Sequence, residues 1–464
     1  MQPNERSFLG TEKISTLMRK FAVPSIIAML VSALYNIIDQ LFIGQAVGID
    51  GNAATNIAFP LTTSCIALAL LFGIGGASCF NLSMGSGDTK RAAGFAGGSA
   101  AMLFLSGLVL CIITQIFMPQ ILSLCGADGG IVEEYANTYM RITAIGFPFL
   151  ILTTGGGHLI RADGSPQLTM ICNIIGAAIN VVLDALFILV FGWGMAGAAL
   201  ATIIGQFVSA VVVVVYLKKF KTVKLELSHF IPKFSSIKRI AAIGMASFFN
   251  QLAMMVVQVV INQLLNTYGE KSVYGATVAL AAAGIVMKVA QVFFSFIIGL
   301  AQGSQPIESF NYGAKNYKRV RDALWFTLGI SAVLSVGASL LFNIFPAQIL
   351  SLFGEGDASY VEFGVRFFRI YLFGVIFNFF QPVVSTFFTS IGKAYKGAFL
   401  SLTRQFLFLL PLLLILPRHF GIDGILYAAP VSDTIALIIT LVMMGIELKG
   451  IKKLEAQQNA AVSG

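Results

Sequence analysis

Long apolar runs recur along the whole chain, and most are near the roughly 20 residues that a helix needs to cross a bilayer. Short polar segments separate them. The pattern predicts twelve membrane-spanning helices, at residues 17–43, 53–81, 92–118, 135–159, 166–191, 193–217, 240–266, 274–307, 319–345, 360–388, 394–417 and 421–447. We therefore expect an all-α polytopic membrane protein.

The second half of the chain repeats the first. The motif QILSL begins at Gln120 and again at Gln348, and Arg141 and Arg369 follow at the same spacing. Each half holds six of the predicted spans, an even number, so both halves enter the membrane from the same side. A pseudo-two-fold axis along the membrane normal should relate them, as in transporters with parallel repeats. The expected lobes are residues 1–217 and 240–464, joined by a basic linker at 218–239.

Composition and charge place this architecture in a membrane and orient it. The chain is 57% hydrophobic and 11% charged, whereas a soluble protein is about a quarter charged. The net charge of +9 does not indicate a nucleic-acid partner, because most of the 30 Lys and Arg residues fall on segments of one side. The opposite loops hold only Lys271 and Arg418. This asymmetry predicts an inner cell membrane protein with both termini cytoplasmic.

Two aspartates inside predicted spans are the first functional candidates. Asp39 lies in YNIIDQL, where the repeat has Asn262, and Asp184 lies in NIIGAAINVVLDALFIL, where the repeat has no charge. At 1.5 Å per residue they stand about 28 and 27 Å along their spans, so they share a level in the outer part of the first lobe. Asn180 precedes Asp184 by one turn, and Thr202 of the next span is in reach.

This grouping suits ion coupling. An ionised aspartate in mid-membrane costs roughly 3 kcal/mol even on a lenient insertion scale. Two that face each other also repel, so one of them should hold a proton. With an amide and a hydroxyl nearby, the pair can hold a shared proton or a small cation. The alternative is a pair of buried, hydrogen-bonded structural residues. We favour function, because the repeat lacks them.

Other intramembrane charges suggest different roles. Arg404 and Asp433 fall at mid-depth on adjacent predicted spans, so a buried structural ion pair is the simplest expectation, with a substrate role as the alternative. Lys288 has no obvious partner and is a candidate to face a central cavity and sense Asp39 and Asp184. Tyr35, Asp39 and Lys288 are the candidate substrate-binding residues. Five scattered cysteines and three scattered histidines predict neither a metal site nor a cofactor.

The sequence resembles the multidrug and toxic compound extrusion (MATE) transporters over nearly its whole length. The resemblance rests on four stretches in order: YNIIDQLFIGQAVG at 35–48, IRADGSPQLTMICNIIGAAINVVLDALFI at 160–188, FGWGMAGAALAT at 191–202 and GLAQGSQPIESFNYGAKNYKRV at 299–320. It implies a V-shaped pair of six-helix lobes that export organic, often cationic and aromatic compounds, driven by proton or sodium entry.

Within that family the chain is similar to the branch of the DNA-damage-inducible F proteins. The resemblance then implies a coupling site in the first lobe, at Asp39, Asn180, Asp184 and Thr202. The other large branch uses acidic residues of the second lobe. Here span seven has Asn250 and Gln251 and span ten has Gln381, so a sodium site in the second lobe is not expected.

Three readings of function follow. We expect a monomeric, proton-coupled exporter of drug-like molecules in the lipid bilayer, with sodium coupling at the same four residues as one alternative. A flippase for lipids or lipid-linked saccharides of the same superfamily is a second, and Lys288 and Arg404 keep it open. A membrane-embedded enzyme would need paired carboxylates on a cytoplasmic loop, and the acids there are isolated. We therefore expect no enzymatic activity.

Overall fold

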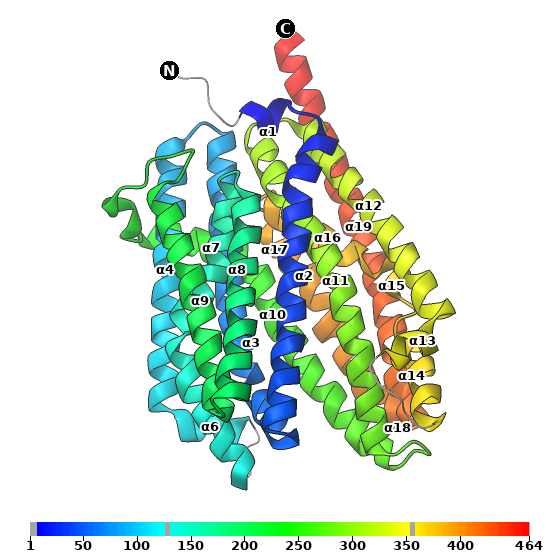
Figure 1. Cartoon of the computed structure of the whole chain (residues 1–464). Helices are drawn as coiled ribbons and strands as arrows, with labels where there is room; N and C mark the ends of the chain where they lie inside the picture. Colours follow the sequence, from blue (N-terminus) through cyan, green and yellow to red (C-terminus); the bar gives the residue numbers. More distant parts are fainter. Residues whose placement is uncertain (1–6, 126–129, 353–357, 464) are drawn as a thin grey trace.

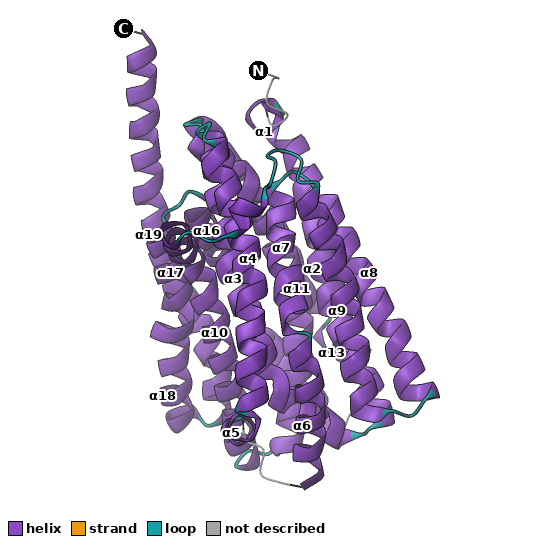
Figure 2. Ribbon diagram, turned by 90° about the vertical axis from the view of Figure 1, so that its left-hand side faces the viewer, coloured by secondary structure: helices purple, strands orange, loops and turns teal. Residues whose placement is uncertain are grey.

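The computed structural model describes residues 7–125, 130–352 and 358–463, and within them nearly all of the chain is helical and none is strand (Figures 1 and 2). In this part of the chain, 10 helices are long and apolar enough to cross a membrane. Two bent helix pairs raise the number of spans to 12. The predicted all-α membrane architecture is confirmed.

The helices form two lobes with the same order of elements. The first lobe contains α2 (Ile14–Ala46), α3 (Ile49–Gly85), α4 (Thr89–Ile116), α5 (Met118–Leu124), α6 (Gly130–Ile145), α7 (Phe147–Ala162), α8 (Pro166–Asp184), the π-helix η1 (Ala185–Val190) and α9 (Gly194–Lys218). The second contains α10 (Phe234–Glu270), α11 (Ala276–Gly313), α12 (Tyr317–Ile344), α13 (Pro346–Ser351), α14 (Ala358–Tyr371), α15 (Val375–Asn378), α16 (Phe380–Ser390), α17 (Ala394–Leu402), the π-helix η3 (Thr403–Leu409), α18 (Leu410–Phe420) and α19 (Ile422–Ser463). Helix α2 packs against α11 while α3 packs against α10, as a two-fold axis between the lobes requires.

The fourth and tenth spans are broken helices, whereas the sequence predicted one continuous span for each. Helices α6 and α7 meet at 56° around Gly146, and α14 meets the α15–α16 segment at 43° around Gly374. In the first lobe Pro148, near the start of α7, has no backbone N–H and so cannot continue the helical hydrogen bonds of α6. In the second lobe a side chain on Gly374 would overlap Asp433, so glycine lets α19 approach there.

The lobes meet at the end of the molecule that carries both chain termini. A Cβ on Gly75 would lie 2.1 Å from the carbonyl oxygen of Ile240, and one on Gly313 would lie 2.3 Å from that of Leu82. Ile307 and Phe310 of the second lobe pack into the hydrophobic cluster of the first. These contacts close the space between the lobes on the side of the termini.

The basic linker packs on the first lobe. The Asp163 carboxylate, just after α7, accepts hydrogen bonds from the backbone N–H groups of Lys221 (2.7 Å) and Thr222 (3.1 Å) and from the hydroxyls of Thr222 and Tyr216. Figure 1 shows this segment, with its short helix η2 (Leu227–Phe230), beside α4 and α9. The linker is therefore docked on the first lobe and is not a free connection between the two lobes.

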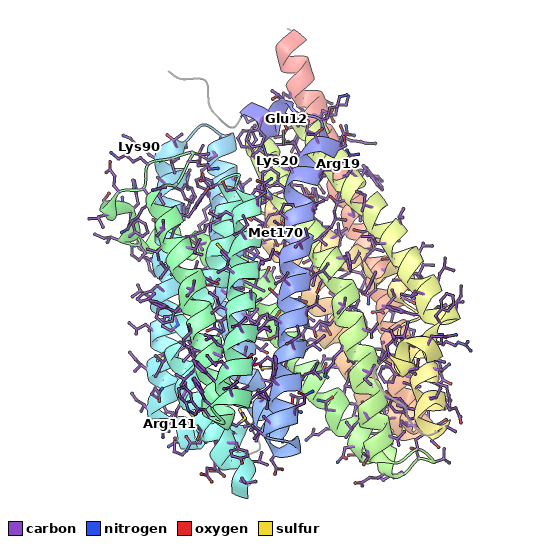
Figure 3. The ribbon with its side chains drawn as sticks, in the orientation of Figure 1. Glu12, Arg19, Lys20, Lys90, Arg141 and Met170 are labelled. Atoms are coloured by element: carbon purple, nitrogen blue, oxygen red, sulfur yellow. The ribbon has the colours of Figure 1, made fainter. Side chains whose placement is uncertain are left out.

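Charged side chains mark the two ends of the molecule. Figure 3 shows Arg19, Lys20 and Lys90 at the end of the termini and Arg141 near the opposite end. All four are exposed. The basic end is the one that the charge asymmetry of the sequence assigns to the cytoplasm.

Candidate functional site

Two buried carboxyl groups lie beside each other inside the first lobe. Asp39 is on α2 and Asp184 is the last residue of α8, two helices that pack together. Their exposed fractions are 9% and 0%. The π-helix η1 begins directly after Asp184, and such widened turns are frequent at functional sites.

The carboxyl pair has acceptor atoms without donors. Oδ1 of Asp39, both carboxyl oxygens of Asp184 and Oδ1 of Asn180 accept no hydrogen bond from the described residues. Two ionised carboxylates in this position would carry a large desolvation cost that no cation beside them among the described residues offsets. A proton shared between them, or a cation ligated by these oxygens, removes that cost. The geometry therefore fits a site that binds a positive charge.

Asn180 and Thr202 complete this cluster. Nδ2 of Asn180 donates to Oγ1 of Thr202 at 3.4 Å, while Oδ1 of Asn180 accepts no hydrogen bond from the described residues. The structure thus brings together all four residues that sequence reasoning proposed for ion coupling. Tyr35 of α2 also lies beside the two aspartates.

Tyr139 of α6 stands beside the same aspartates and was missed from the sequence. The repeat offers a signal that could have found it, because the matching position in the second lobe is Phe367, which has no hydroxyl. Its hydroxyl adds another polar group to the wall of the site.

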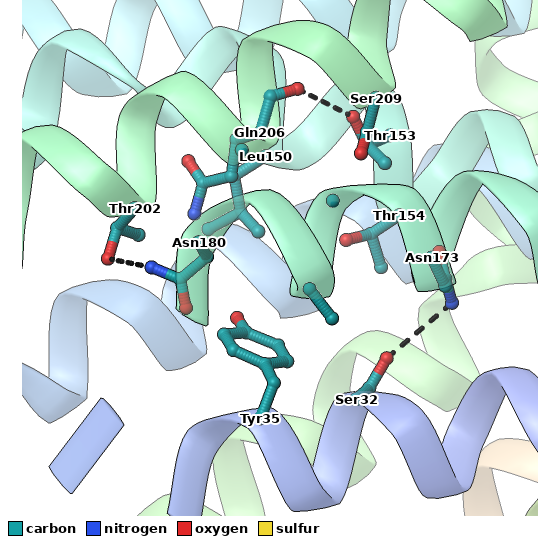
Figure 4. A pocket seen from close by; sticks show the side chains of 13 residues that line it. Ser32, Tyr35, Leu150, Thr153, Thr154, Asn173, Asn180, Thr202, Gln206 and Ser209 are labelled. Carbon is teal, nitrogen blue, oxygen red and sulfur yellow. Dashed lines mark hydrogen bonds between the residues drawn. The ribbon is translucent and has the colours of Figure 1, made fainter. Parts of the chain in front are cut away.

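A polar cavity of about 90 Å³ adjoins the cluster on the side of the termini (Figure 4). It has room for several water molecules. Its polar lining comes from α2, α7, α8 and α9: Ser32, Tyr35, Thr153, Thr154, Asn173, Asn180, Thr202, Gln206 and Ser209. Asn173 donates to Ser32 at 3.5 Å and Thr153 to the Gln206 carbonyl at 3.4 Å, distances long enough for these groups to bond water as well.

Helical spacing explains why these side chains gather. Asn173, Asn180 and Asp184 recur at seven and four residues along α8, and Gln206 and Ser209 continue from Thr202 along α9 in the same way. Residues at such spacings share one helix face. Sequence reasoning used Asn180 and Asp184 of α8 and Thr202 of α9, and missed Asn173, Gln206 and Ser209, although the 3.6-residue periodicity could have shown that they share the same helix faces.

The intramembrane charges of the second lobe are arranged differently. Nε of Arg404, within η3, contacts Oδ1 of Asp433 at 2.5 Å, and Asn378 donates to the other carboxyl oxygen at 3.2 Å. The side chains of Arg404 and Asp433 are 17% and 2% exposed. This is a buried ion pair, the arrangement expected for a structural role.

Lys288 is half-buried on α11 and does not line the polar cavity. It stands three helix turns from Gly299, whose backbone contacts Ile26 of α2, and therefore on the face of α11 that turns toward α2. Its role as a sensor or as a substrate contact stays a prediction.

Two six-helix lobes that meet at one end of the membrane, with a polar cavity and a carboxyl pair inside one of them, define a membrane transporter of the two-lobed class. The chain belongs to the MatE family, whose model matches residues 24–186 and 243–415, one match in each lobe. The family resemblance seen in the sequence is confirmed.

Relatives and solved structures agree with this membership. The multidrug export protein MepA of Staphylococcus haemolyticus is 24% identical over 442 residues, which cover 95% of each chain. A solved multidrug resistance MATE family transporter of the MOP superfamily, in an outward-facing conformation, is similar with a TM-score of 0.89 and 22% identity, over 98% of this chain and 100% of that one. A MOP superfamily transporter from Pyrococcus furiosus, whose binding-pocket polarity is described as reversed, gives a TM-score of 0.88 at 22% identity, over 97% and 100%.

Proposed function

We propose that the protein is a secondary antiporter, not an enzyme, that exports small organic compounds, mainly cationic and aromatic, in exchange for protons. It works as a monomer in the inner cell membrane with both termini in the cytoplasm. One observation carries the proposal: Asp39 and Asp184 are buried side by side, and their carboxyl oxygens that lack hydrogen-bond donors can be balanced by a proton or a cation. The multidrug export relatives support the export direction and drug-like substrates in general.

The site supplies the coupling step in this proposal. With the lobes closed at the end of the termini, a proton enters from the opposite, outer side and neutralises the carboxyl pair. Loss of that charge releases a cationic substrate. When the lobes open toward the cytoplasm, the proton leaves through the polar cavity. When one proton is exchanged for one monovalent cation no net charge crosses the membrane, so the pH difference drives export: one pH unit supplies about 1.4 kcal/mol, enough for about a tenfold substrate gradient.

The cavity inside the first lobe is a path for protons and water rather than the drug site. At about 90 Å³ it is smaller than the roughly 300 Å³ or more that drug-sized ligands occupy. The substrate therefore binds between the lobes, where Tyr35, Asp39 and Lys288 are the candidate contacts.

The decisive experiment is efflux of a fluorescent lipophilic cation from proteoliposomes in sodium-free buffer with an imposed pH gradient. We expect the parent protein to move dye, and Asp39→Asn and Asp184→Asn each to lose at least tenfold in rate. Asp50→Asn is the matched control, because Asp50 is an exposed carboxylate at the start of α3. Equal transport by the parent and by both site variants would refute the coupling role.

Sodium coupling at the same site is the second candidate. The free oxygens of Asp39, Asn180 and Asp184, with the Thr202 hydroxyl, form the oxygen-rich ligand set that hard cations prefer. Sodium is the coupling ion if the parent protein transports dye only after sodium is added. If Asn180→Ala then raises the sodium concentration that transport requires, the coupling site is still the one proposed here.

Flippase activity is the remaining alternative. A phosphate-bearing lipid needs free cationic groups, and Arg404 is occupied by Asp433. Lys288 alone is a weak basis for it. A drug-accumulation assay in cells separates the two, because a dedicated flippase confers no resistance.

A further inference from the structure

The basic linker exposes large apolar side chains on the flank of the first lobe that faces away from the second lobe (Figure 1). Leu227, Ile231 and Phe234 are 88%, 73% and 82% exposed, although they stand among charged residues and outside the predicted spans. Docking of the linker does not use them. Other apolar side chains of the segment pack against the hydrophobic cluster of the first lobe: Leu225, Phe230 and Ile237. The three exposed residues are therefore free to contact another molecule.

The contact between η2 and α4 sets the depth of this segment. A Cβ on Gly97 of α4 would lie 2.6 Å from the carbonyl oxygen of His229 in η2. Arg91 is the last charged residue of α4, six residues before Gly97, and none follows it up to Ile116. Six residues of helix rise about 9 Å, whereas the headgroup layer on one side of a bilayer is about 5–8 Å thick. The short helix η2 therefore lies beside the apolar part of α4, where lipid headgroups meet acyl chains.

The surface around the exposed apolar residues is strongly basic. Residues 218–239 contain one acid, Glu226, and seven Lys and Arg residues. All seven basic side chains are exposed: Lys218, Lys219, Lys221, Lys224, Lys233, Lys238 and Arg239. The guanidinium of Arg239 stands 5.9 Å from the ring of Phe95, and that of Arg91 stands 5.6 Å from the same ring. Among the described residues no carboxylate forms an ion pair with either arginine. The surface thus has an excess of cationic groups that an anionic partner can balance.

We propose that residues 218–239 form a binding surface for anionic phospholipids of the leaflet on the side of the termini. Leu227, Ile231 and Phe234 insert between the lipids at the base of the headgroups, and the basic side chains around them bind the lipid phosphates. Apolar side chains surrounded by lysine and arginine at this depth are typical of segments that lie in a membrane interface. A soluble protein partner fits less well, because the apolar residues stand at the level of the lipid and not above it.

The binding surface goes beyond the proposed antiport, because it uses neither the carboxyl pair nor the polar cavity. Each lysine near an anionic membrane surface favours binding by roughly fivefold. Several together should hold anionic lipids beside the linker at a higher fraction than in the bulk bilayer. Since the linker joins α9 of the first lobe to α10 of the second, these lipids anchor the junction of the two lobes.

The test places a single tryptophan at the proposed contact in the full-length protein. The two native tryptophans, Trp193 and Trp325, are replaced by phenylalanine, and Phe234→Trp is introduced. The protein is reconstituted in equal amounts of phosphatidylglycerol and phosphatidylcholine, with bromine on the acyl chains of one lipid or of the other. Bromine quenches tryptophan fluorescence only at close contact, so the two preparations report which lipid touches position 234. No substrate or ion gradient is present, and the outcome therefore does not depend on the antiport proposal.

We expect quenching in both preparations, and at least about twofold more when phosphatidylglycerol carries the bromine. Leu227→Trp is a second reporter, which should give the same result if Phe234→Trp disturbs the start of α10. A control protein keeps Trp193 as its only tryptophan, 49% exposed at the opposite end of the molecule. Both lipids should quench it equally.

Charge variants of the reporter protein test the role of the basic side chains. One variant removes three exposed lysines of the linker: Lys219→Gln, Lys224→Gln and Lys233→Gln. Its matched control removes three exposed lysines of α19 at the same end of the molecule: Lys449→Gln, Lys452→Gln and Lys453→Gln. The linker variant should bring the two quenching values closer together, whereas the α19 variant should leave them unchanged.

Three results would overturn the lipid-binding surface. If neither lipid quenches position 234 or 227, the apolar residues face water or a soluble partner. If both lipids quench equally, the surface does not select anionic lipid. If the linker variant keeps the full preference, or the α19 variant loses it, the linker lysines are not its cause.

Discussion

Arg404 and Asp433 show at the scale of single residues how the second lobe keeps charges inside the membrane without an ion site. Both charged groups are desolvated, and the 2.5 Å contact between Nε of Arg404 and Oδ1 of Asp433 offsets the desolvation cost. Breaking such a pair leaves one uncompensated charge, which costs about 3–5 kcal/mol, whereas replacing both partners by apolar residues is close to neutral.

We therefore predict that Arg404→Met and Asp433→Leu each lower the melting temperature strongly, and that the double variant recovers most of the loss. Thermal unfolding in detergent measures this cycle. The comparison variant is Arg366→Met, because Arg366 and its partner Asp423 are only half-buried, with side chains 36% and 31% exposed, so solvent screens the charge left behind and the loss should be smaller than for the buried pair. A double variant as unstable as the singles would contradict a pairwise role.

The aspartates were predictable and several of their neighbours were not. Asp39 and Asp184 stand out because an apolar span tolerates a carboxylate only for a reason, and because the repeat lacks them. Tyr139 stands out less, since aromatic residues are common in spans and usually pack or face lipid, and only the missing hydroxyl of Phe367 in the repeat distinguishes it. Glu308 was hidden for another reason: it stands near a span end, where a glutamate normally reaches water, but only 1% of its surface is exposed in the structure.

At the scale of elements, twelve spans follow from hydrophobic length, but the internal shape of a span does not. Periodicity does not register the bends at Gly146 and Gly374, because the apolar pattern continues through them. The apolar pattern also gives no sign of the two π-helices. Yet η1 directly follows Asp184 and η3 contains Arg404. Both depend on how the helix packs against its neighbours.

The linker supplies a prediction at this scale. Asp163→Ala removes the acceptor that holds Lys221, Thr222 and Tyr216. A hydrogen bond to a charged group contributes about 1.5–3 kcal/mol, so the undocked population should rise at least tenfold. Trypsin cleavage after the exposed Lys221 and Lys224 should accelerate accordingly.

Asp88→Ala is the matched control for the linker, since Asp88 caps α4 near the same end through the backbone N–H of Arg91 at 3.0 Å. If that variant accelerates linker cleavage as much as Asp163→Ala does, docking by Asp163 is not the cause.

At the scale of the whole molecule, the two lobes and their axis could be predicted from the internal repeat, while the way the lobes meet could not. A repeat relates equivalent helices but leaves the angle between the halves free. That angle is set by small residues whose importance appears only in contact: Gly75 and Gly244 bring α3 and α10 together, and Gly299 and Gly303 bring α11 against α2. Their tight approach defines a state closed at the end of the termini.

Gly244 gives the sharpest test of that closure. A Cβ there would lie 1.8 Å from the carbonyl oxygen of Leu71, and because this oxygen belongs to the backbone, no side-chain rotation can relieve the overlap. Gly244→Ala must separate α3 and α10 by roughly 2 Å to reach ordinary contact. We predict a longer distance between spin labels attached at Lys90→Cys and Lys318→Cys, two exposed positions near the end of the termini, and a lower efflux rate. Alanine is about 1 kcal/mol better than glycine inside a helix, so weakened helicity cannot account for the loss.

Gly284→Ala, on α11 with no atom within 4 Å of the added methyl group, should change neither quantity. An unaltered distance in Gly244→Ala would mean that the closure does not depend on this contact.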